Sequence, residues 1–168
     1  MCRELKFRPI KIEDFSFFQL MWQEEKVVRY TNIKVPLSDE LAKERMTLFL
    51  KLQEDMENTT LFTILYNDEP CGMVGCLPID ETKTVYGLFY QLGSRFWGKK
   101  IATQSAKWML DYMVKHRQDI HLVADVVEAN VASKRILENL GFVMTHKEKG
   151  AFTYLGKSLD VLYYNWQA

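Results

Sequence analysis

The feature that most constrains this chain is the segment 90–116, which reads YQLGSRFWGKKIATQSAKWMLDYMVKH. Its first residues form an apolar strand, the chain turns through residues 93–100, and an amphipathic helix is predicted over residues 101–116. The apolar run at residues 120–127 then completes a βαβ unit, in which a right-handed crossover joins two parallel strands. Free amides and the positive end of the helix dipole lie at the start of such a helix, so the segment predicts a site for a phosphate-bearing ligand.

The known nucleotide-binding motifs do not fit this turn. Gly93 and Gly98 have the spacing of a P-loop, but Lys99 is followed by Lys100 and not by the hydroxyl residue that holds Mg²⁺. The Gly-x-Gly-x-x-Gly fingerprint of dinucleotide-binding proteins is absent. A P-loop nucleotide enzyme is therefore disfavoured, and the phosphate must belong to another ligand.

Two motifs, in the same order, resemble those of the GNAT superfamily of N-acetyltransferases. The pattern Arg95-x-x-Gly98-x-Lys100 is similar to the Arg/Gln-x-x-Gly-x-Gly/Ala loop of that family. The segment 127–142, VEANVASKRILENLGF, is similar to the Asn-x-x-Ser…Leu-x-Lys-Leu-Gly-Phe segment of the branch that includes the ribosomal-protein Nα-acetyltransferases. The resemblance extends over residues 5–166 and implies an enzyme that transfers an acetyl group from acetyl-coenzyme A to a primary amine.

The composition is that of one globular domain covering residues 1–168, with 48% hydrophobic residues. Lys and Arg (22) balance Asp and Glu (22), so nothing in the charge attracts nucleic acid or a membrane surface. The N-terminus lacks the apolar core of a signal peptide, and we expect a cytoplasmic protein, a monomer or homodimer. Cys2, Cys71 and Cys76 have no paired metal spacing, so we expect free thiols and no metal.

The hydrophobic pattern predicts an α+β protein with a single mainly antiparallel sheet and helices on both faces. The resemblance implies that this is the GNAT fold, in which one parallel strand pair is splayed. Gly72 and Gly75 indicate a bulge in their strand. Strands are expected at residues 5–10, 61–66, 71–77, 84–92, 120–127, 142–147, 151–155 and 159–166. Helices are expected at residues 15–22, 26–30, 101–116 and 130–139, with a further one opened by Ser38.

The resemblance implies where the coenzyme binds. Its pantetheine arm would lie between the strands at residues 84–92 and 120–127, and its pyrophosphate would rest on the backbone of residues 97–102. Lys100 departs from the glycine or alanine of the family, and its side chain either adds positive charge or is simply solvated. The residues expected to bind the coenzyme are Tyr90, Gln91, Leu92, Arg95, Trp97, Gly98, Lys99, Lys100, Ile101, Ala102 and Asn130.

Direct acetyl transfer needs an acid for the departing thiolate and donors for the carbonyl oxygen. Many relatives use a tyrosine seven residues after the asparagine that corresponds to Asn130, but that position is Leu137 here. The ribosomal-protein branch has a serine three residues after the asparagine, and Ser133 matches it. We therefore expect Ser133 to donate the proton and a strand amide near Leu92 to stabilise the oxygen.

The general base is less clear, because the glutamate that relatives carry in the strand before the loop is replaced by Gly87. Asp125 is the first candidate, since it interrupts an apolar strand and should point away from the face taken by its neighbours Ala124 and Val126. The alternatives, each acting through water, are Asp80, Glu81 and Tyr86. His116 and His121 receive no role.

The acceptor stays open among a protein N-terminus, a polyamine, an amino sugar and a small metabolite. Net neutrality weighs against a strongly cationic acceptor. Aromatic residues and methionines of the N-terminal third either belong to the core or line an acceptor pocket. Because the usual glutamate and tyrosine are missing, a non-catalytic acyl-coenzyme A-binding module is the alternative.

Overall fold

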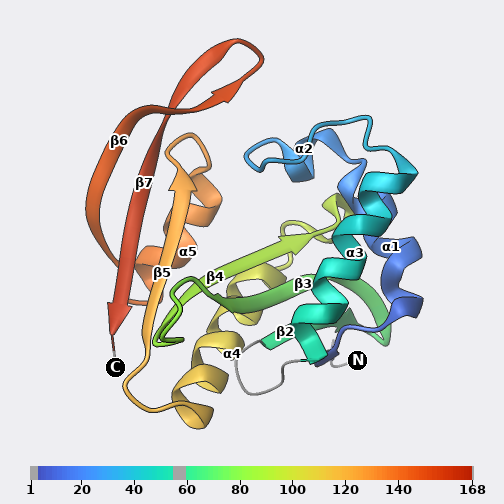
Figure 1. The fold of residues 1–168 in the computed structure, drawn as a ribbon, viewed down its shortest axis with the longest axis horizontal. Helices are drawn as coiled ribbons and strands as arrows, with labels where there is room; N and C mark the ends of the chain where they lie inside the picture. Colours follow the sequence, from blue (N-terminus) through green and yellow to red (C-terminus); the bar gives the residue numbers. More distant parts are fainter. Residues whose placement is uncertain (1–3, 55–59, 168) are drawn as a thin grey trace.

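The computed structural model describes residues 4–54 and 60–167, which form one seven-stranded sheet flanked by helices (Figure 1). The strand order is β1-β2-β3-β4-β5-β7-β6, and only β4 and β5 are parallel. The strands are β1 Leu5–Pro9, β2 Thr60–Tyr66, β3 Glu69–Pro78, β4 Val85–Leu92, β5 His121–Val127, β6 Val143–Tyr154 and β7 Lys157–Gln167. The α-helices are α1 Phe15–Trp22, α2 Glu25–Val28, α3 Asp39–Glu54, α4 Ile101–His116 and α5 Val131–Asn139.

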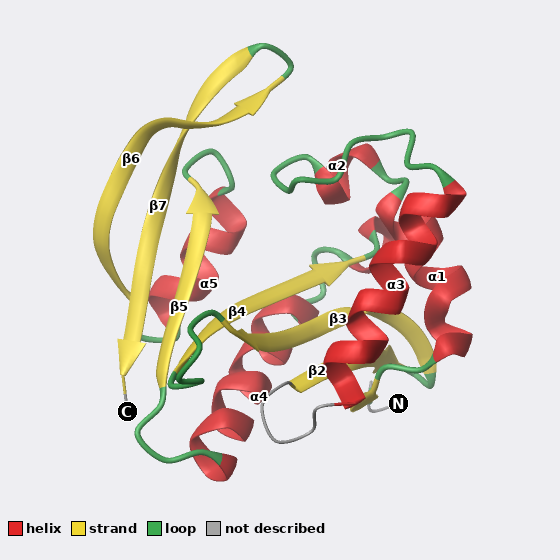
Figure 2. Cartoon of the chain, in the orientation of Figure 1, coloured by secondary structure: helices red, strands yellow, loops and turns green. Residues whose placement is uncertain are grey.

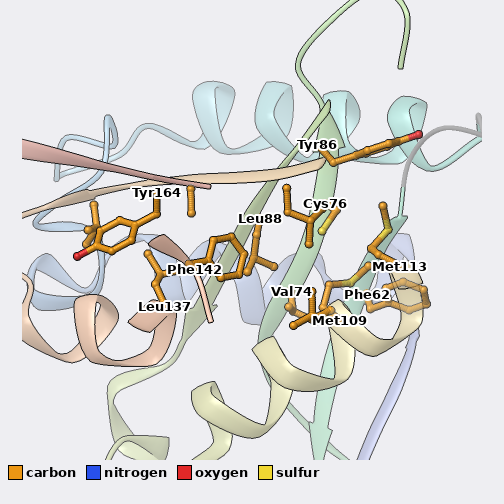
Figure 3. Close-up of a cluster of buried hydrophobic side chains, with 14 of the residues drawn as sticks. Phe62, Val74, Cys76, Tyr86, Leu88, Met109, Met113, Leu137, Phe142 and Tyr164 are labelled. Carbon is orange, nitrogen blue, oxygen red and sulfur yellow. The ribbon is translucent and has the colours of Figure 1, made fainter. Parts of the chain in front are cut away.

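Helices cover both faces of the sheet, as the sequence predicted (Figure 2). We call the face covered by α4 and α5 the α4 face, and the face covered by α1 and α3 the α3 face. Alternation along each strand divides the core between them, because successive side chains point to opposite faces. Figure 3 shows Val74 and Cys76 of β3 packed with Met109 and Met113 of α4, whereas Met73 packs on the α3 face.

The parallel pair opens soon after it begins. β4 and β5 pair only from Val85–His121 to Gly87–Val123. Beyond that point β4 stays bonded to β3 and β5 stays bonded to β7, so the two strands diverge (Figure 1). We call the space between residues 88–92 of β4 and residues 124–127 of β5 the strand gap. The predicted splayed pair is confirmed.

The C-terminal strands differ from the prediction of separate strands at residues 142–147 and 151–155. They form one long strand, β6, because β7 pairs with it on both sides of Gly150 and the interruption is absorbed as a bulge. Gly150 has a φ of 64°, and its amide donates to Asp160 Oδ1 (2.9 Å), which replaces the missing ladder bond. Lys157 begins β7, after a two-residue turn at Leu155-Gly156.

The tip of the β6–β7 hairpin reaches across to α2. Tyr154 donates its hydroxyl proton to Glu25, and its ring lies 6.3 Å from that of Tyr30. A cavity of about 680 Å³ lies between this tip and the loop that follows α2. The hairpin tip and α2 are thereby in contact beyond the strand gap.

Other local predictions are confirmed. The helix over residues 101–116 has the expected bounds, and Ser38 accepts a hydrogen bond from the Leu41 amide at the start of α3. The β2–β3 register shifts beside Gly72, as predicted, whereas Gly75 pairs regularly with Leu61. Cys71 and Cys76 are buried free thiols, while Cys2 lies outside the described residues. Within those residues no helix is long and apolar enough to cross a membrane.

Candidate active site

A cavity of about 390 Å³ occupies the strand gap. Leu88 and Val126 in its wall belong to the core of the α4 face, whereas Phe49 and Phe89 belong to that of the α3 face, so the cavity reaches both faces of the sheet. Its polar lining residues are Tyr30, Thr31, Asn32, Arg45, Tyr90, Gln91, Asp125, Asn130 and Ser133.

The edge of β4 that faces the gap has unpaired backbone groups. Val85 and Gly93 both hydrogen-bond to the β3 side, at 3.0 and 2.9 Å. Alternate residues of an antiparallel strand point to the same neighbour, so every odd-numbered residue between them also faces β3. The backbone of Leu88 and Tyr90 is therefore directed at the gap, where no strand receives it. This is the edge along which the sequence placed Tyr90, Gln91 and Leu92.

The opposite edge, on β5, is open in the same way. The Glu128 amide donates to Asp160 on the β7 side (2.9 Å), and the His121 amide donates to Thr84 on the β4 side (3.3 Å). Odd-numbered residues of β5 thus direct their backbone towards β4, and the peptide groups of Asp125 face the gap. Two unsatisfied edges separated by a cavity are suited to an extended polar ligand that hydrogen-bonds like a strand.

The loop before α4 carries free amides. Among the described residues none of the amides of residues 98–103 has a hydrogen-bond partner, and Lys100 gives no side-chain cap to the helix. Gly98 and Lys100 both have left-handed backbones, with φ of 74° and 62°. A Cβ on Gly98 would meet nothing within 4 Å, so the loop surface is open. Free amides at the start of a 16-residue helix form an anion site.

The other residues of this loop divide into structural and charged groups. Ile101 is buried in the core, and the Trp97 indole donates to the Leu92 carbonyl (3.1 Å), which connects the loop to the end of β4. Lys99 and Lys100 are exposed, and the ion pairs within the described residues do not include them. Arg95 lies over the Phe96 ring (4.6 Å) and 3.8 Å from a carboxylate oxygen of Glu69.

The left-handed backbone explains why a glycine is preferred at position 100. A residue with a side chain loses about 1–2 kcal/mol of conformational free energy in this region, whereas glycine does not. Lys100 therefore has a strained backbone, and its side chain adds a positive charge beside the free amides.

Ser133 has a partner that sequence reasoning missed. The hydroxyl of Tyr90 lies 2.8 Å from Ser133 Oγ, across the gap from β4 to α5. Burial raises the pKa of Tyr90 to about 12, so its hydroxyl keeps its proton at neutral pH. Asn130 caps α5 by accepting the Ser133 amide (3.3 Å), which holds the serine in the first turn. Even-numbered side chains of β4 face α5. This alternation could have predicted from the sequence that Tyr90 lies on the same face as Ser133.

Asp125 lies where the resemblance leaves a carboxylate missing. Gly87 and Val123 form the last β4–β5 pair, and by alternation Val123 points to the α3 face, as a side chain at position 87 would. Asp125 is two residues further along β5, hence on the same face, exposed, and in the cavity wall. Its neighbours Ala124 and Val126 are buried in the core of the α4 face, as predicted.

The alternative bases lie elsewhere. Asp80 accepts hydrogen bonds from Thr82, Val85 and Thr84 in the turn before β4, and these lower its pKa to about 2. Tyr86 is buried, and neither it nor Glu81 lines the cavity. Asp125 is thus the one carboxylate of the described residues in the cavity wall.

The α3 side of the cavity is built from distant segments. Arg45 and Phe49 come from α3, and the Phe49 and Phe89 rings lie 6.2 Å apart and nearly parallel. Trp22 of α1 donates its indole N–H to Gln91 Oε1 (3.2 Å), so Gln91 presents its amide NH₂ group to other partners. Aromatic residues of the N-terminal third therefore belong to the core and also shape a pocket.

Comparison with known proteins places this geometry in context. The acetyltransferase (GNAT) domain family matches residues 4–143. The uncharacterized N-acetyltransferase p20 of Bacillus licheniformis is 26% identical over 140 residues, which make up 82% of this chain and 78% of that protein.

Solved structures share the fold. RimL, a ribosomal L7/L12 alpha-N-protein acetyltransferase in complex with coenzyme A, has a TM-score of 0.85 and 17% identity, over 97% of this chain and 93% of that one. Spermidine N-acetyltransferase from Vibrio cholerae, in complex with coenzyme A and spermine, has a TM-score of 0.81 and 17% identity, over 97% and 95%. At these identities the likeness is one of architecture.

Proposed function

Since this chain belongs to the acetyltransferase (GNAT) domain family and is an acyltransferase, we propose that it transfers the acetyl group of acetyl-coenzyme A directly to a primary amine. The observation that carries the proposal is the joining of two features. The free amides of residues 98–103 lie at one end of the open β4 edge, and a cavity through the sheet lies beside that edge.

In this proposal the coenzyme is bound by backbone groups. The amides of residues 98–103 hold the pyrophosphate, with Lys99 and Lys100 adding positive charge. The free peptide groups of Leu88 and Tyr90 bond the pantetheine arm as a neighbouring strand would. The thioester then lies in the gap, where the exposed backbone amides of β4 can stabilise the carbonyl oxygen as it becomes negative.

Ser133 and Tyr90 act as the acid. Ser133 Oγ donates its proton to the departing thiolate and receives one from the Tyr90 hydroxyl, 2.8 Å away, and Tyr90 regains its proton from water before the next turnover. The raised pKa of Tyr90 keeps the pair protonated before the reaction. Leu137, in the position of the usual tyrosine, is buried in the core and contributes shape only.

Asp125 acts as the base. Only a neutral amine attacks a thioester, so the ammonium acceptor must first lose a proton. Asp125 lies on the α3 face of the gap, opposite the face that holds Ser133. It accepts the proton through a water molecule, and the amine enters from the α3 face.

The proposal is tested by incubating the protein with acetyl-coenzyme A and a panel of primary amines while free thiol is measured. Direct transfer predicts thiol release only when both substrates are present, and no acetylated protein in mass spectra taken without an amine. Calorimetry with coenzyme A measures binding separately. Binding without thiol release across the whole panel would contradict the proposed transfer.

A further inference from the structure

Arg45 has no anionic partner among the described residues. Its guanidinium lies 5.3 Å from the ring centres of both Trp22 and Phe49, and it lines the cavity. Within the described residues no carboxylate lies within ion-pairing distance of it, and no hydrogen bond reaches it. Arg45 is half-buried, and a charge that is partly removed from water without a partner is costly.

The three nitrogens of Arg45 differ in access. Nε is buried without a partner, whereas neither Nη is among the buried unpaired atoms of the described residues, although neither has a partner. The two Nη groups are therefore accessible while Nε is covered, and Arg45 lines the cavity. Two adjacent N–H donors in a plane match the two oxygens of a carboxylate or phosphate.

The surrounding side chains hold this fork in place. Trp22 is bonded to Gln91 of β4, and Phe49 packs against Phe89 of the same strand, so both rings beneath the guanidinium are attached to the wall of the gap. Burial lowers the pKa of Arg45, but a guanidinium remains protonated in proteins. Arg45 is thus a preorganised positive group on the α3 face.

We propose that the acceptor carries an oxyanion, a carboxylate or a phosphate, in addition to its amine, and that Arg45 binds it. The inference rests on the proposed function, because it assigns the acceptor to the α3 face. Asp125 lies in the same cavity wall but forms no ion pair with Arg45, so the cavity presents separate negative and positive groups. A zwitterionic amine matches both, whereas a polyamine would place a second cation against Arg45.

The first experiment observes Arg45 directly. Its Nε–H is shielded from solvent, so its NMR signal should be visible, and Arg45→Gln assigns the signal by its loss. The protein, saturated with coenzyme A, is titrated with N-acetyl amino acids and with their amides. N-acetylphosphoethanolamine and N-acetylethanolamine form the phosphate pair. We expect the signal to shift with the oxyanion member of at least one pair and not with its neutral partner.

The second experiment measures acetylation of the matching free amines: amino acids and their amides, phosphoethanolamine and ethanolamine, and spermidine. For the preferred oxyanion, Arg45→Gln should lower kcat/KM about 10- to 100-fold, the usual value of a hydrogen-bonded charge. The same variant should leave the neutral partner nearly unchanged. Arg117→Gln is the matched control, since Arg117 also lies over a ring (Tyr86, 5.8 Å) but does not line the cavity.

The outcomes separate the two proposals. Acetylation that prefers neutral amines or spermidine would overturn the oxyanion assignment and leave the transferase standing. An equal loss for both members of a pair, in an Arg45→Gln protein whose melting temperature and coenzyme affinity match the wild type, would also overturn it. If no amine is acetylated, the transferase proposal fails, and absence of a selective Arg45 shift rejects the oxyanion site independently.

Discussion

The two faces of the strand gap are built in different ways. On the α4 side the proposed coenzyme site uses backbone groups from one short stretch, residues 98–103, together with the adjacent edge of β4. On the α3 side the proposed acceptor site uses side chains from α3, the loop after α2, β4 and β5. The coenzyme side is made of peptide groups that are close in the sequence. The acceptor side is made of side chains from segments that are far apart in the sequence.

This difference has a physical consequence for how each face can change. Peptide amides are present whatever the side chain, so the α4 side depends on backbone conformation and tolerates sequence changes that keep it. The α3 side depends on which side chains project into the cavity. A protein with this arrangement can change its acceptor without changing its coenzyme, and the following predictions test that separation.

The largest effect is expected from Gly98→Asp. A carboxylate beside the free amides would repel the pyrophosphate and reduce coenzyme affinity about 100-fold or more, since like-charge contacts cost several kcal/mol. Gly98→Asn is the control, because asparagine has the same size and tolerates the left-handed backbone. Calorimetry should give a coenzyme affinity for Gly98→Asn close to that of the wild type. Equal losses in the two variants would indicate strain at φ 74° as the cause instead of charge.

The next effect is expected from the Tyr90–Ser133 pair, on the α4 face of the gap. Ser133→Ala should lower kcat about 10-fold, a modest value for an acid because a coenzyme thiol leaves readily. Coenzyme affinity should change less. Tyr90→Phe should reduce kcat by a similar factor, and the double variant should be no slower than either single one if the two groups act in series. Unchanged turnover in Ser133→Ala would remove it as the donor.

The same tyrosine predicts a pH dependence of stability. An unfolded tyrosine ionises near pH 10, whereas Tyr90 in the fold has a pKa of about 12. Between these values the unfolded state binds fewer protons, so the free energy of unfolding falls as pH rises, by about 3 kcal/mol in total. Tyr90→Phe lacks this contribution. Chemical unfolding from pH 9 to 12 should show a steeper decline for wild type than for the variant, and parallel curves would contradict the burial of the hydroxyl.

Asp125→Asn tests the α3 side alone. We expect kcat to fall about 10-fold below neutral pH, where the acceptor is most protonated, and to recover as pH approaches the pKa of the amine. Coenzyme affinity should not change, because Asp125 contacts the gap from the face opposite Ser133. A loss that does not depend on pH would indicate a positioning role in place of proton transfer.

The smallest effect is expected from Lys100→Gly. Glycine removes the strain of φ 62°, worth about 1 kcal/mol, but also removes a positive charge worth up to about 1 kcal/mol at an exposed position. The variant should therefore melt at a higher temperature while coenzyme affinity changes less than about fivefold. Its affinity should depend less on salt, because one cation is missing.

Regions formed by residues close in the sequence were predictable, whereas regions formed by contacts between distant segments were not. The helix over residues 101–116 and its loop follow from periodicity and glycine placement within a short window. The single strand β6 was missed because Gly150 signals a turn locally, whereas pairing with β7 on both sides retains it as a bulge. Only the tertiary partner decides between these outcomes.

The candidate site follows the same rule. Ser133 and Asp125 could be proposed from motif and alternation, but Arg45 could not, since nothing in α3 distinguishes it from the other charged residues of that helix. Its position depends on packing against Trp22 and Phe49, one of which lies 23 residues away. The Tyr90 hydroxyl likewise required the distance from β4 to α5.

The contact between Tyr154 and Glu25 gives the gap a closed outline. Backbone pairing at Gly87 and Val123 bounds it at one end, and the hairpin contact with α2 bounds it at the other. The chain thus forms a ring around an aperture in the sheet, held at two opposite points of its rim. A molecule that occupies the aperture passes through the plane of the sheet, and substrates that react there arrive from opposite sides of the ring.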